Sequence, residues 1–426
     1  MTCFSPSLLV ALSTWPLLQP PAAEGETWPQ YHGPHGNRSV AAELDLDRWK
    51  EDGPPVAWRV PTELGFSSFA IADGQALTLV RRDEGGEGRE VCVALDVETG
   101  ETRWSTAVGP ATYDGGGDAG ADGNKGGDGP RSTPSIVGDA VYVFDASFTI
   151  TCLAAKDGEV RWKHSLTTEN EAADIRWQNA AAPVVHDGRL FVAGSGEGQS
   201  LLALDARDGS VIWKTGTETP THATPVVCDL HGVTQVIFYV QSGLVSCDVE
   251  TGAELWRTEY PFRISSAASP VVYEDMVYVS AGYGVGAGVF RIGHDGEEFV
   301  PELMWQLRNK LMNHWSTPVV KDGYLYGMFS FKKYGDGPLK CVEMATGEER
   351  WSEDGYGPGN CIIVGDKVVA LTDYGEVVVV EATPEAYREL ARAELLDGKC
   401  WSSPVFADGQ VYVRSTREGV RLDLGD

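Results

Sequence analysis

The stretch ALDVETGETRW, residues 94–104, contains the end of one strand, a tight turn and the start of a second strand. Four related stretches follow: CLAAKDGEVRW (152–162), ALDARDGSVIW (203–213), SCDVETGAELW (246–256) and CVEMATGEERW (341–351). In each of them a tryptophan stands four residues after a glycine, and glycine supplies the positive φ that a tight hairpin requires. The chain therefore repeats one hairpin with one large aromatic residue, which we expect to fill the gap between neighbouring sheets.

A second hairpin signal lies between the tryptophans. A short apolar strand, often opened by Ser/Thr-Pro, is followed by an Asp-Gly-like turn and an alternating strand, which is a strong β-hairpin pattern. STPSIVGDAVYV (132–143) and STPVVKDGYLYG (316–327) are clear copies, whereas SSFAIADGQALTL (67–79) and NCIIVGDKVVAL (360–371) are looser ones. The eight predicted turns fall near Gly74, Gly138, Gly188, Gly232, Asp275, Gly323, Gly365 and Gly409.

The spacing of the repeat indicates the fold. Successive tryptophans of the repeat lie 43 to 58 residues apart, and four short strands in such a period are typical of a β-propeller blade. We predict an all-β, eight-bladed β-propeller of four-stranded antiparallel blades. Seven blades is the alternative if residues 360–371 and their successor near RELARAELL (388–396) do not form a blade.

The two ends of the repeat region predict how the ring closes. The last repeat stops before its tryptophan strand, and the first recognisable strand, PPVAWRV (54–60), is a tryptophan strand with nothing before it. We therefore expect the strand around Trp58 to form the outer edge of the last blade, which would leave no open seam in the ring.

Charge and the N-terminal residues bear on location and partners. The chain has 62 acidic and 34 basic residues and a formal charge of −28, which argues against nucleic acid and anionic membrane surfaces as partners. An apolar run from Leu8 to Leu18 precedes Ala22 and Ala23, and it resembles a signal peptide but is too short to span a bilayer. Because no Lys or Arg precedes the run, a start that is not a signal is the alternative.

These features divide the chain into residues 1–23 as signal peptide, 24–53 as an N-terminal segment and 54–426 as the propeller. We expect a monomeric protein that is periplasmic or otherwise exported, without a transmembrane span. No C-x-x-C pair occurs among the eight cysteines, and four of them occupy similar strand positions, where we predict small buried apolar residues: Cys92, Cys152, Cys247 and Cys341. The disulfide pattern stays open.

Taken together, ALDxxTGxxxW and SPVVxDGxVYV resemble the pyrroloquinoline quinone (PQQ)-like propeller repeat. That repeat occurs in quinoprotein alcohol dehydrogenases, in the propeller lipoprotein of the outer-membrane barrel-assembly machinery and in exported planctomycete-type proteins. The opening WPQYHGPHGNRSV (28–40) is similar to that of the last group, with His32 where Arg is usual. The resemblance spans Trp28 to Leu424 and implies the propeller fold, while the chain has neither the adjacent Cys-Cys of the dehydrogenases nor a cysteine just after the apolar run.

Residues just before the first strand of each blade should meet at one mouth of the propeller. Aromatic, amide and cationic side chains there would suit a planar or sugar-like ligand; the alternative is that they cap the ring and are solvated. Trp177, Trp315 and Trp401 would be the residues that recognise a carbohydrate. The predicted ligand-binding candidates are Arg131, Trp177, Asn179, His222, Lys310, Asn313, His314, Trp315, Lys399 and Trp401.

Other motifs do not add a catalytic or metal site. The loop YDGGGDAGADGNKGGDGP (113–130) has oxygen ligands but not the spacing of a calcium loop, so we interpret it as solvated. GYGVGAG (282–288) lacks the helix that a dinucleotide loop requires, and Ser330 to Lys333 lacks the companion motifs of an S-x-x-K enzyme. No catalytic residues and no metal ligands are assigned.

The lead hypothesis is thus an exported binding or scaffold protein of the cell envelope, whose partner is a protein, a small molecule or a carbohydrate. The alternative is a PQQ-dependent, quinoprotein-like alcohol or sugar dehydrogenase that holds PQQ, with calcium, in the funnel of the propeller. The sequence leaves open whether the protein is an enzyme.

Overall fold

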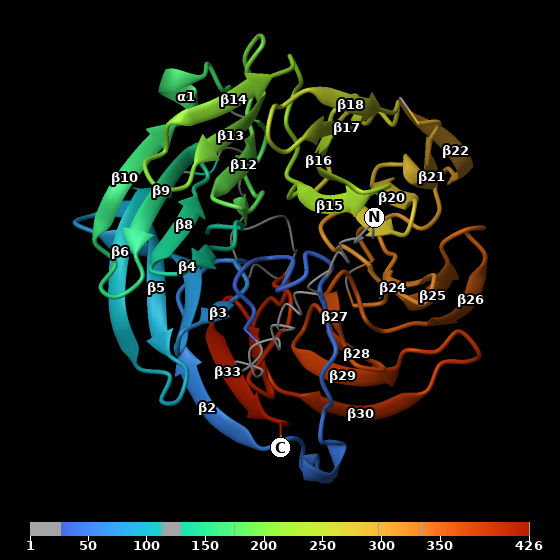
Figure 1. The fold of residues 1–426 in the computed structure, drawn as a ribbon. Coiled ribbons are helices and arrows are strands. Elements are labelled where there is room, and N and C mark those ends of the chain that lie inside the picture. Colours follow the sequence, from blue (N-terminus) through green and yellow to red (C-terminus); the bar gives the residue numbers. More distant parts are fainter. Residues whose placement is uncertain are drawn as a thin grey trace, which may run out of the picture.

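The computed structural model describes residues 27–111, 113, 129–173, 175–296, 298–333 and 335–425. Within these residues eight sheets surround one axis (Figure 1), so the predicted eight-bladed, all-β propeller is confirmed. The predicted signal peptide, 1–23, and the acidic residues 114–128 of the glycine-rich loop lie outside the described residues.

Each blade has four antiparallel strands, and blades are numbered by their first strand. The strands follow in chain order except in blade 8, whose outer strand comes from the N-terminal part of the chain, and the sheet of blade 7 gains a short parallel fifth strand, residues 39–40. Blade 1 consists of β3 (Ala70–Ala72), β4 (Gln75–Glu84), β5 (Glu87–Asp96) and β6 (Thr102–Pro110). Blade 2 consists of β7 (Ser135–Val137), β8 (Ala140–Phe144), β9 (Thr149–Ala154) and β10 (Val160–Ser165). Blade 3 consists of β11 (Val184–His186), β12 (Arg189–Ala193), β13 (Leu201–Asp205) and β14 (Val211–Thr215). Blade 4 consists of β15 (Val226–Leu230), β16 (Val233–Val240), β17 (Gly243–Asp248) and β18 (Glu254–Arg257).

The second half of the ring repeats this arrangement with a longer hairpin in blade 5. Blade 5 consists of β19 (Val271–Tyr273), β20 (Met276–Ala281), β21 (Gly286–His294) and β22 (Phe299–Leu307). Blade 6 consists of β23 (Val319–Lys321), β24 (Tyr324–Met328), β25 (Leu339–Glu343) and β26 (Glu349–Glu353). Blade 7 consists of β27 (Asn360–Val364), β28 (Lys367–Leu371), β29 (Glu376–Glu381) and β30 (Glu389–Glu394). Blade 8 consists of β31 (Val405–Ala407), β32 (Gln410–Arg414), β33 (Glu418–Asp423) and β2 (Val56–Pro61).

Helical structure is minor in the part of the chain that the structure describes. The helical elements are α1 (Leu166–Glu169) and a single 3₁₀ turn (Leu46–Arg48), and the remaining strand is β1 (Ser39–Val40). No helix among these residues has both the length and the apolar character needed to cross a bilayer.

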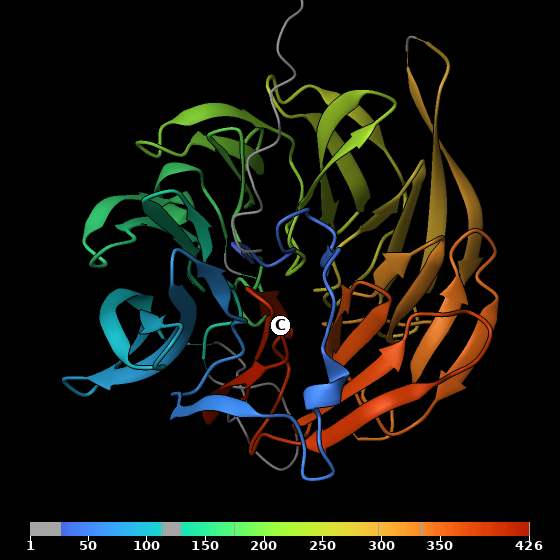
Figure 2. The same cartoon turned by 60° about the horizontal axis from the view of Figure 1, so that its bottom comes forward.

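The first strands of the blades contact one another around the axis, and the last strands lie on the outside (Figures 1 and 2). Each first strand therefore begins at one end of the central channel and reaches its hairpin turn at the other end. We call the end at which the first strands begin the upper mouth, and the end with their turns the lower mouth.

The repeated tryptophans lie between neighbouring blades, as predicted. The Trp104 ring of blade 1 packs against Gly158 of blade 2 so closely that a Cβ there would collide with it. Its indole Nε1 donates to the carbonyl oxygen of Ala155 at 2.9 Å, and Trp213 donates to Val249 of the following blade at 3.0 Å in the same way. The turn glycine thus provides both the positive φ and the space for the indole, which is why the two residues recur together.

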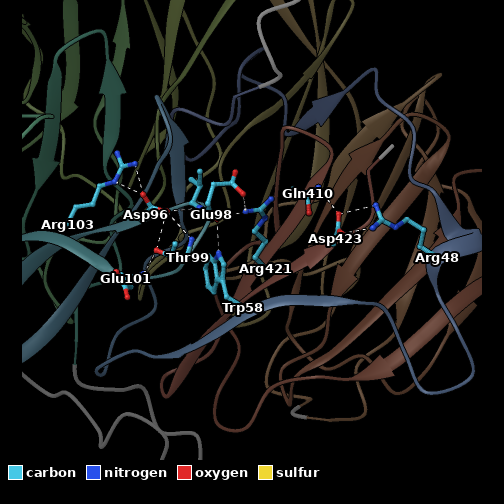
Figure 3. Close-up of polar contacts among 11 residues, drawn as sticks. Arg48, Trp58, Asp96, Glu98, Thr99, Glu101, Arg103, Gln410, Arg421 and Asp423 are labelled. Atoms are coloured by element: carbon cyan, nitrogen blue, oxygen red, sulfur yellow. Dashed lines mark hydrogen bonds and ion pairs between the residues drawn. The ribbon is translucent and has the colours of Figure 1, made fainter.

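The N-terminal tryptophan strand closes the ring in the predicted way. β2 pairs antiparallel with β33, from Val56 opposite Leu422 to Pro61 opposite Glu418. At this junction Trp58 Nε1 donates to the carbonyl oxygen of Val97 at 2.8 Å, which joins blade 8 to blade 1 (Figure 3). The Arg421 guanidinium reaches Glu98 across the same boundary at 2.9 Å.

The lower mouth is covered by the floor segment, which we define as residues 28–40. Its first residue, Trp28, exchanges both backbone hydrogen bonds with Ile71 of blade 1 at 2.9 and 2.8 Å. Its last strand, β1, pairs in parallel with β27 next to the turn at Gly365. The segment therefore crosses the centre of the ring (Figure 2) and connects blade 1 with blade 7, the next blade but one around the axis.

Blade 7 departs most from the repeat, and N-terminal residues compensate for it. Strand register places Asn360 and Cys361 where blade 6 has Thr317 and Pro318, and Ala391 where blade 6 has its tryptophan. The fully buried Arg38 guanidinium donates to the carbonyl oxygen of Thr317, and to the carbonyl oxygen of Cys361 and the hydroxyl of Ser403, both at 2.8 Å. Trp49 packs against the same core cluster as Ala391.

The seven described cysteines are unpaired, and the four from the repeat are fully buried, which confirms their predicted role as small apolar residues.

Candidate functional site

Loops that lead into the first strands form the upper mouth, and buried amides set their course. Asn179 Nδ2 donates to the carbonyl oxygens of Phe144 and Ala181 at 3.3 and 3.2 Å. Asn313 Nδ2 donates to the carbonyl oxygen of Met328 at 3.0 Å, while its Oδ1 accepts from the Tyr278 hydroxyl at 2.6 Å. These two predicted candidates therefore hold the loops in place, and their polar atoms are already engaged.

Three aromatic side chains from three blades meet at the mouth and form, with His314, the aromatic arc. Phe66 stacks on Trp401 with ring centroids 4.9 Å apart, and Trp401 contacts Trp315 at the same separation. Trp315 in turn meets His314 edge-on at 5.1 Å. The structure thus brings together three of the predicted candidates and adds Phe66.

The repeat in the sequence could have identified Phe66 as a residue of the mouth. Phe66, Trp315 and Trp401 all stand directly before the two-residue segment that opens a first strand: Ser67-Ser68, Ser316-Thr317 and Ser402-Ser403. Blade 1 has Phe69 where most blades have proline, so its copy of the motif was the looser one. Tyr283 and Phe331, which extend the arc beyond His314 with centroids at 5.2 and 5.1 Å, lie in turns between second and third strands and carried no repeat signal.

On the other side of the mouth, Trp177, His222 and Arg131 form a second group. The Trp177 and His222 ring centroids are 6.4 Å apart, and Arg131 Nη1 donates to the carbonyl oxygen of Trp177 at 3.1 Å. The Arg176 guanidinium lies 4.4 Å from the centroid of the Trp177 ring, within the range of a cation–π contact. Trp177 also has a φ of +68°, a strained conformation for a bulky residue that is often found at binding sites.

The two histidines of the mouth are neutral. Burial lowers the pKa of His314 to about 3, and the positive charges that His222 and Lys332 can carry reinforce the shift. Burial and then Arg131 lower the pKa of His222 to about 4, and its Nε2 lies 2.9 Å from the carbonyl oxygen of Arg176. Positive charge at the mouth therefore comes from arginine and lysine, including Lys332, whose ammonium lies 4.8 Å from the Tyr283 centroid.

The two remaining lysine candidates have neighbours other than the rings of the arc. Lys399 is close enough to the buried Asp373 to oppose the rise in its pKa, which burial nevertheless brings to about 6. Lys310 lines a recess between blades 5 and 6. The structure therefore does not bring all ten predicted residues into one group.

A buried acid lies between blades 1 and 2, and no sequence pattern indicated it. Glu90 accepts from the Tyr113 hydroxyl at 2.7 Å and from the backbone N–H of Ala146 at 3.1 Å. Burial, with the negative charge of Asp145 as a second cause, raises the pKa of Glu90 to about 8. The carboxyl group is consequently protonated at neutral pH.

The arrangement of donor side chains decides whether a metal ion could be held. No group of three His, Cys, Asp or Glu side chains within the described ranges could hold an ion. The described residues therefore do not fit a calcium-assisted quinone site, although the aromatic arc and the neighbouring cations offer surfaces to a planar anion.

Comparison with known proteins identifies one matching family. A family model described as outer membrane protein assembly factor BamB matches residues 87–353. The outer membrane protein assembly factor BamB of Yersinia pestis is 24% identical over 291 residues, which are 62% of this chain and 69% of that protein.

Solved structures agree in fold. BamB from Moraxella catarrhalis superposes with a TM-score of 0.59 at 15% identity, covering 86% of this chain and 97% of that one. Quinohemoprotein alcohol dehydrogenase from Comamonas testosteroni superposes with a TM-score of 0.63 at 14% identity, covering 94% and 81%. At these identities the two structures establish the propeller fold and nothing about activity.

Proposed function

The chain belongs to the family of the outer membrane protein assembly factor BamB, and from this premise we propose that it is a scaffold protein of the cell envelope that holds a protein partner at its upper mouth. Export would follow from residues 1–23 acting as a signal peptide. The protein would act as a monomer, with the partner as its second component.

One observation carries the proposal: the aromatic arc lies at the upper mouth, while the chain's own floor segment covers the lower mouth. Tryptophan, tyrosine and arginine are the residues that most often dominate protein–protein binding energy. Here they come from loops on several blades, so a partner that seats on them would contact a rigid, preformed surface, which limits the entropic cost of binding.

Site-specific photo-crosslinking tests this proposal. In one variant a photo-reactive residue replaces Lys399, which is two residues before Trp401 in the sequence. In the control variant it replaces Val137, which is 47% exposed at the end of the first strand of blade 2, at the lower mouth. We expect position 399 to capture one discrete protein in intact cells and position 137 not to capture it. Adding Trp315→Ala and Trp401→Ala should abolish the adduct, whereas equal capture at both positions, or capture that survives the double substitution, would contradict the proposal.

The alternative is an oxidoreductase that binds PQQ at the same mouth. It is favoured by the aromatic arc with cations around it, since flat anionic rings stack on indoles and pair with arginine and lysine. Because the described residues do not fit a calcium site, we derive no catalytic step through the quinone.

A titration separates the two functions. PQQ is added to the purified protein with and without calcium, and binding is followed by quenching of tryptophan fluorescence and by dye reduction with an alcohol. Stoichiometric binding with dye reduction would support the dehydrogenase and displace the scaffold as the main function. No quenching at high micromolar quinone would remove the alternative.

A further inference from the structure

A recess of about 480 Å³ opens beside the upper mouth, between the loop that leaves β22 and the loop that joins β24 to β25. This volume falls within the range of small-molecule sites, which is about 300–1,000 Å³. Phe331 lines the recess and also meets His314 of the aromatic arc at 5.1 Å, so the two sites are neighbours. The recess nevertheless has its own set of polar groups, and none of them takes part in the arc.

The walls of the recess are largely apolar. Phe329 and Leu311 are buried, while Met312 and Phe331 are partly exposed along the same cavity. Leu311 has a φ of +51°, an outlying conformation for a bulky residue without a polar side chain to stabilise it. Such backbone strain concentrates at ligand sites, and here the strained residue is one of those that line the cavity.

Positive charge collects at this recess in a strongly acidic protein. The segment 307–340, which supplies most of the lining, contains six basic and two acidic residues, whereas the whole chain has 34 basic and 62 acidic ones. Lys310 and Lys333 line the cavity and are exposed, and neither forms an ion pair within the part of the chain that the structure describes. Lys340 is held by Glu349, which leaves the first two ammonium groups for a ligand.

A buried hydroxyl completes the polar side of the recess. Ser330 lines the cavity and is 4% exposed, and its Oγ has no hydrogen-bond partner among the described residues. A buried hydroxyl without a partner costs free energy, so a ligand oxygen that accepted its hydrogen bond would be favoured. Two ammonium groups and one O–H donor together select an acceptor that carries negative charge.

We propose that the recess is a binding site for a small amphipathic carboxylate with an aromatic or branched aliphatic body. The body lies against Phe329, Leu311 and Met312, and the carboxylate is paired by Lys310 and Lys333 and accepts from the Ser330 hydroxyl. This site is independent of the partner proposed for the aromatic arc, because each could be occupied without the other.

Two probes of equal size test the charge requirement. Phenylacetate and its neutral amide, 2-phenylacetamide, are titrated into the full-length protein, and binding is measured by calorimetry and ligand-detected NMR. We expect phenylacetate to bind at millimolar concentration and the amide to bind about tenfold more weakly, because the amide loses the two ammonium contacts. Equal binding of the two probes, or no binding of phenylacetate at that concentration, would overturn the proposal.

Three variants locate the site on the molecule. Lys310→Gln with Lys333→Gln should weaken phenylacetate binding about five- to tenfold and leave the amide unchanged. Ser330→Ala should weaken it about threefold without lowering the thermal midpoint, since no existing hydrogen bond is lost. Lys321→Gln, on the first strand of the same blade, is the matched control and should have no effect. If the double lysine variant bound phenylacetate as tightly as the parent, the carboxylate would bind elsewhere and the proposal would be wrong.

Discussion

The two ends of the channel differ in what fills them. At the lower mouth the chain's own floor segment occupies the centre and pairs with β27 and Ile71 by backbone hydrogen bonds. From there the Arg38 guanidinium reaches along the channel to four acceptors near the beginnings of first strands. At the upper mouth, aromatic rings from different blades touch one another, and cations lie against neighbouring rings. The lower end is therefore completed by folding, and the upper end offers the side chains on which the proposed partner would seat.

This difference shows where stability and function are separated. Substitutions at the lower end remove contacts between blades, so they should lower the free energy of unfolding. Substitutions at the upper end should mainly change binding. The following predictions test that division, beginning with the largest expected effect.

Arg38→Ala should lower the free energy of unfolding by about 3–5 kcal/mol, measured by urea denaturation. The substitution leaves the carbonyl oxygens of Thr317 and Cys361 and the hydroxyl of Ser403 without their donor in a buried site. Arg38→Lys should recover only part of the loss, because one ammonium cannot reproduce the fork of a guanidinium.

Arg89→Ala is the matched control, since the Arg89 side chain is only partly buried and its ion-pair partner Glu87 is 72% exposed. Surface pairs contribute about 0–1 kcal/mol. If Arg38→Ala and Arg89→Ala lowered the free energy of unfolding equally, the contacts of the floor segment would not stabilise the fold as predicted.

Glu90→Gln tests a buried group of the blade 1–2 boundary through its pH dependence. The pKa of Glu90 is raised from 4.5 to about 8 in the folded protein. The stability that comes from its protonated carboxyl group is therefore fully present below pH 4.5 and is lost as pH rises through 8. Between pH 7 and 8 the free energy of unfolding of the parent should fall by about 1 kcal/mol because of this group, since the full slope of about 1.4 kcal/mol per pH unit declines near the folded pKa. The variant should lose none of it.

Urea midpoints at intervals across that pH range provide the measurement. The window lies above the unfolded pKa of histidine and above the value of about 6 for the folded Asp145 and Asp373, so these groups do not obscure the slope. Glu87→Gln, on the same strand but exposed, should keep the slope of the parent. A parent whose stability is constant across the window would contradict the protonated state of Glu90.

Trp401→Ala should have the smallest effect on folding, about 1–2 kcal/mol, because its ring is only partly buried at the mouth. Trp351→Ala is the contrast: its ring lies between blades and its Nε1 donates to Thr383 at 2.8 Å, so we expect a loss of about 3–5 kcal/mol. Thermal unfolding of both variants checks the difference, and a larger loss for Trp401→Ala would mean that the aromatic arc is part of the core.

Much of the architecture could be predicted because it depends on local patterns. A glycine followed four residues later by tryptophan specifies both a turn and the contact that this turn makes with the preceding blade, as Gly158 and Trp104 show. The strand around Trp58 could be placed in the last blade because its partner strand was missing at the other end of the sequence.

The floor segment could not be predicted in the same way. Residues 28–40 carry no strand periodicity, and their contacts with Ile71, Ile363 and Ser403 join positions far apart in the sequence. Likewise, the predicted site residues were chosen for their place before a first strand, which correctly aligned Trp315 with Trp401. That rule does not reveal whether a side chain faces the mouth, is held by the backbone like Asn313, or lines a neighbouring recess like Lys310.

The sequence by itself determined the repeat and favoured eight blades over seven, because both follow from hairpins and apolar alternation within about 50 residues. It also indicated the strand that closes the ring, because one end of the repeat region has the strand that the other end is missing. Only the tertiary structure decided that one mouth is closed by the chain and the other is lined with aromatic rings and cations. That outcome depends on which side chains from eight separate blades are brought to the same height along the axis, and no local pattern encodes such a distance.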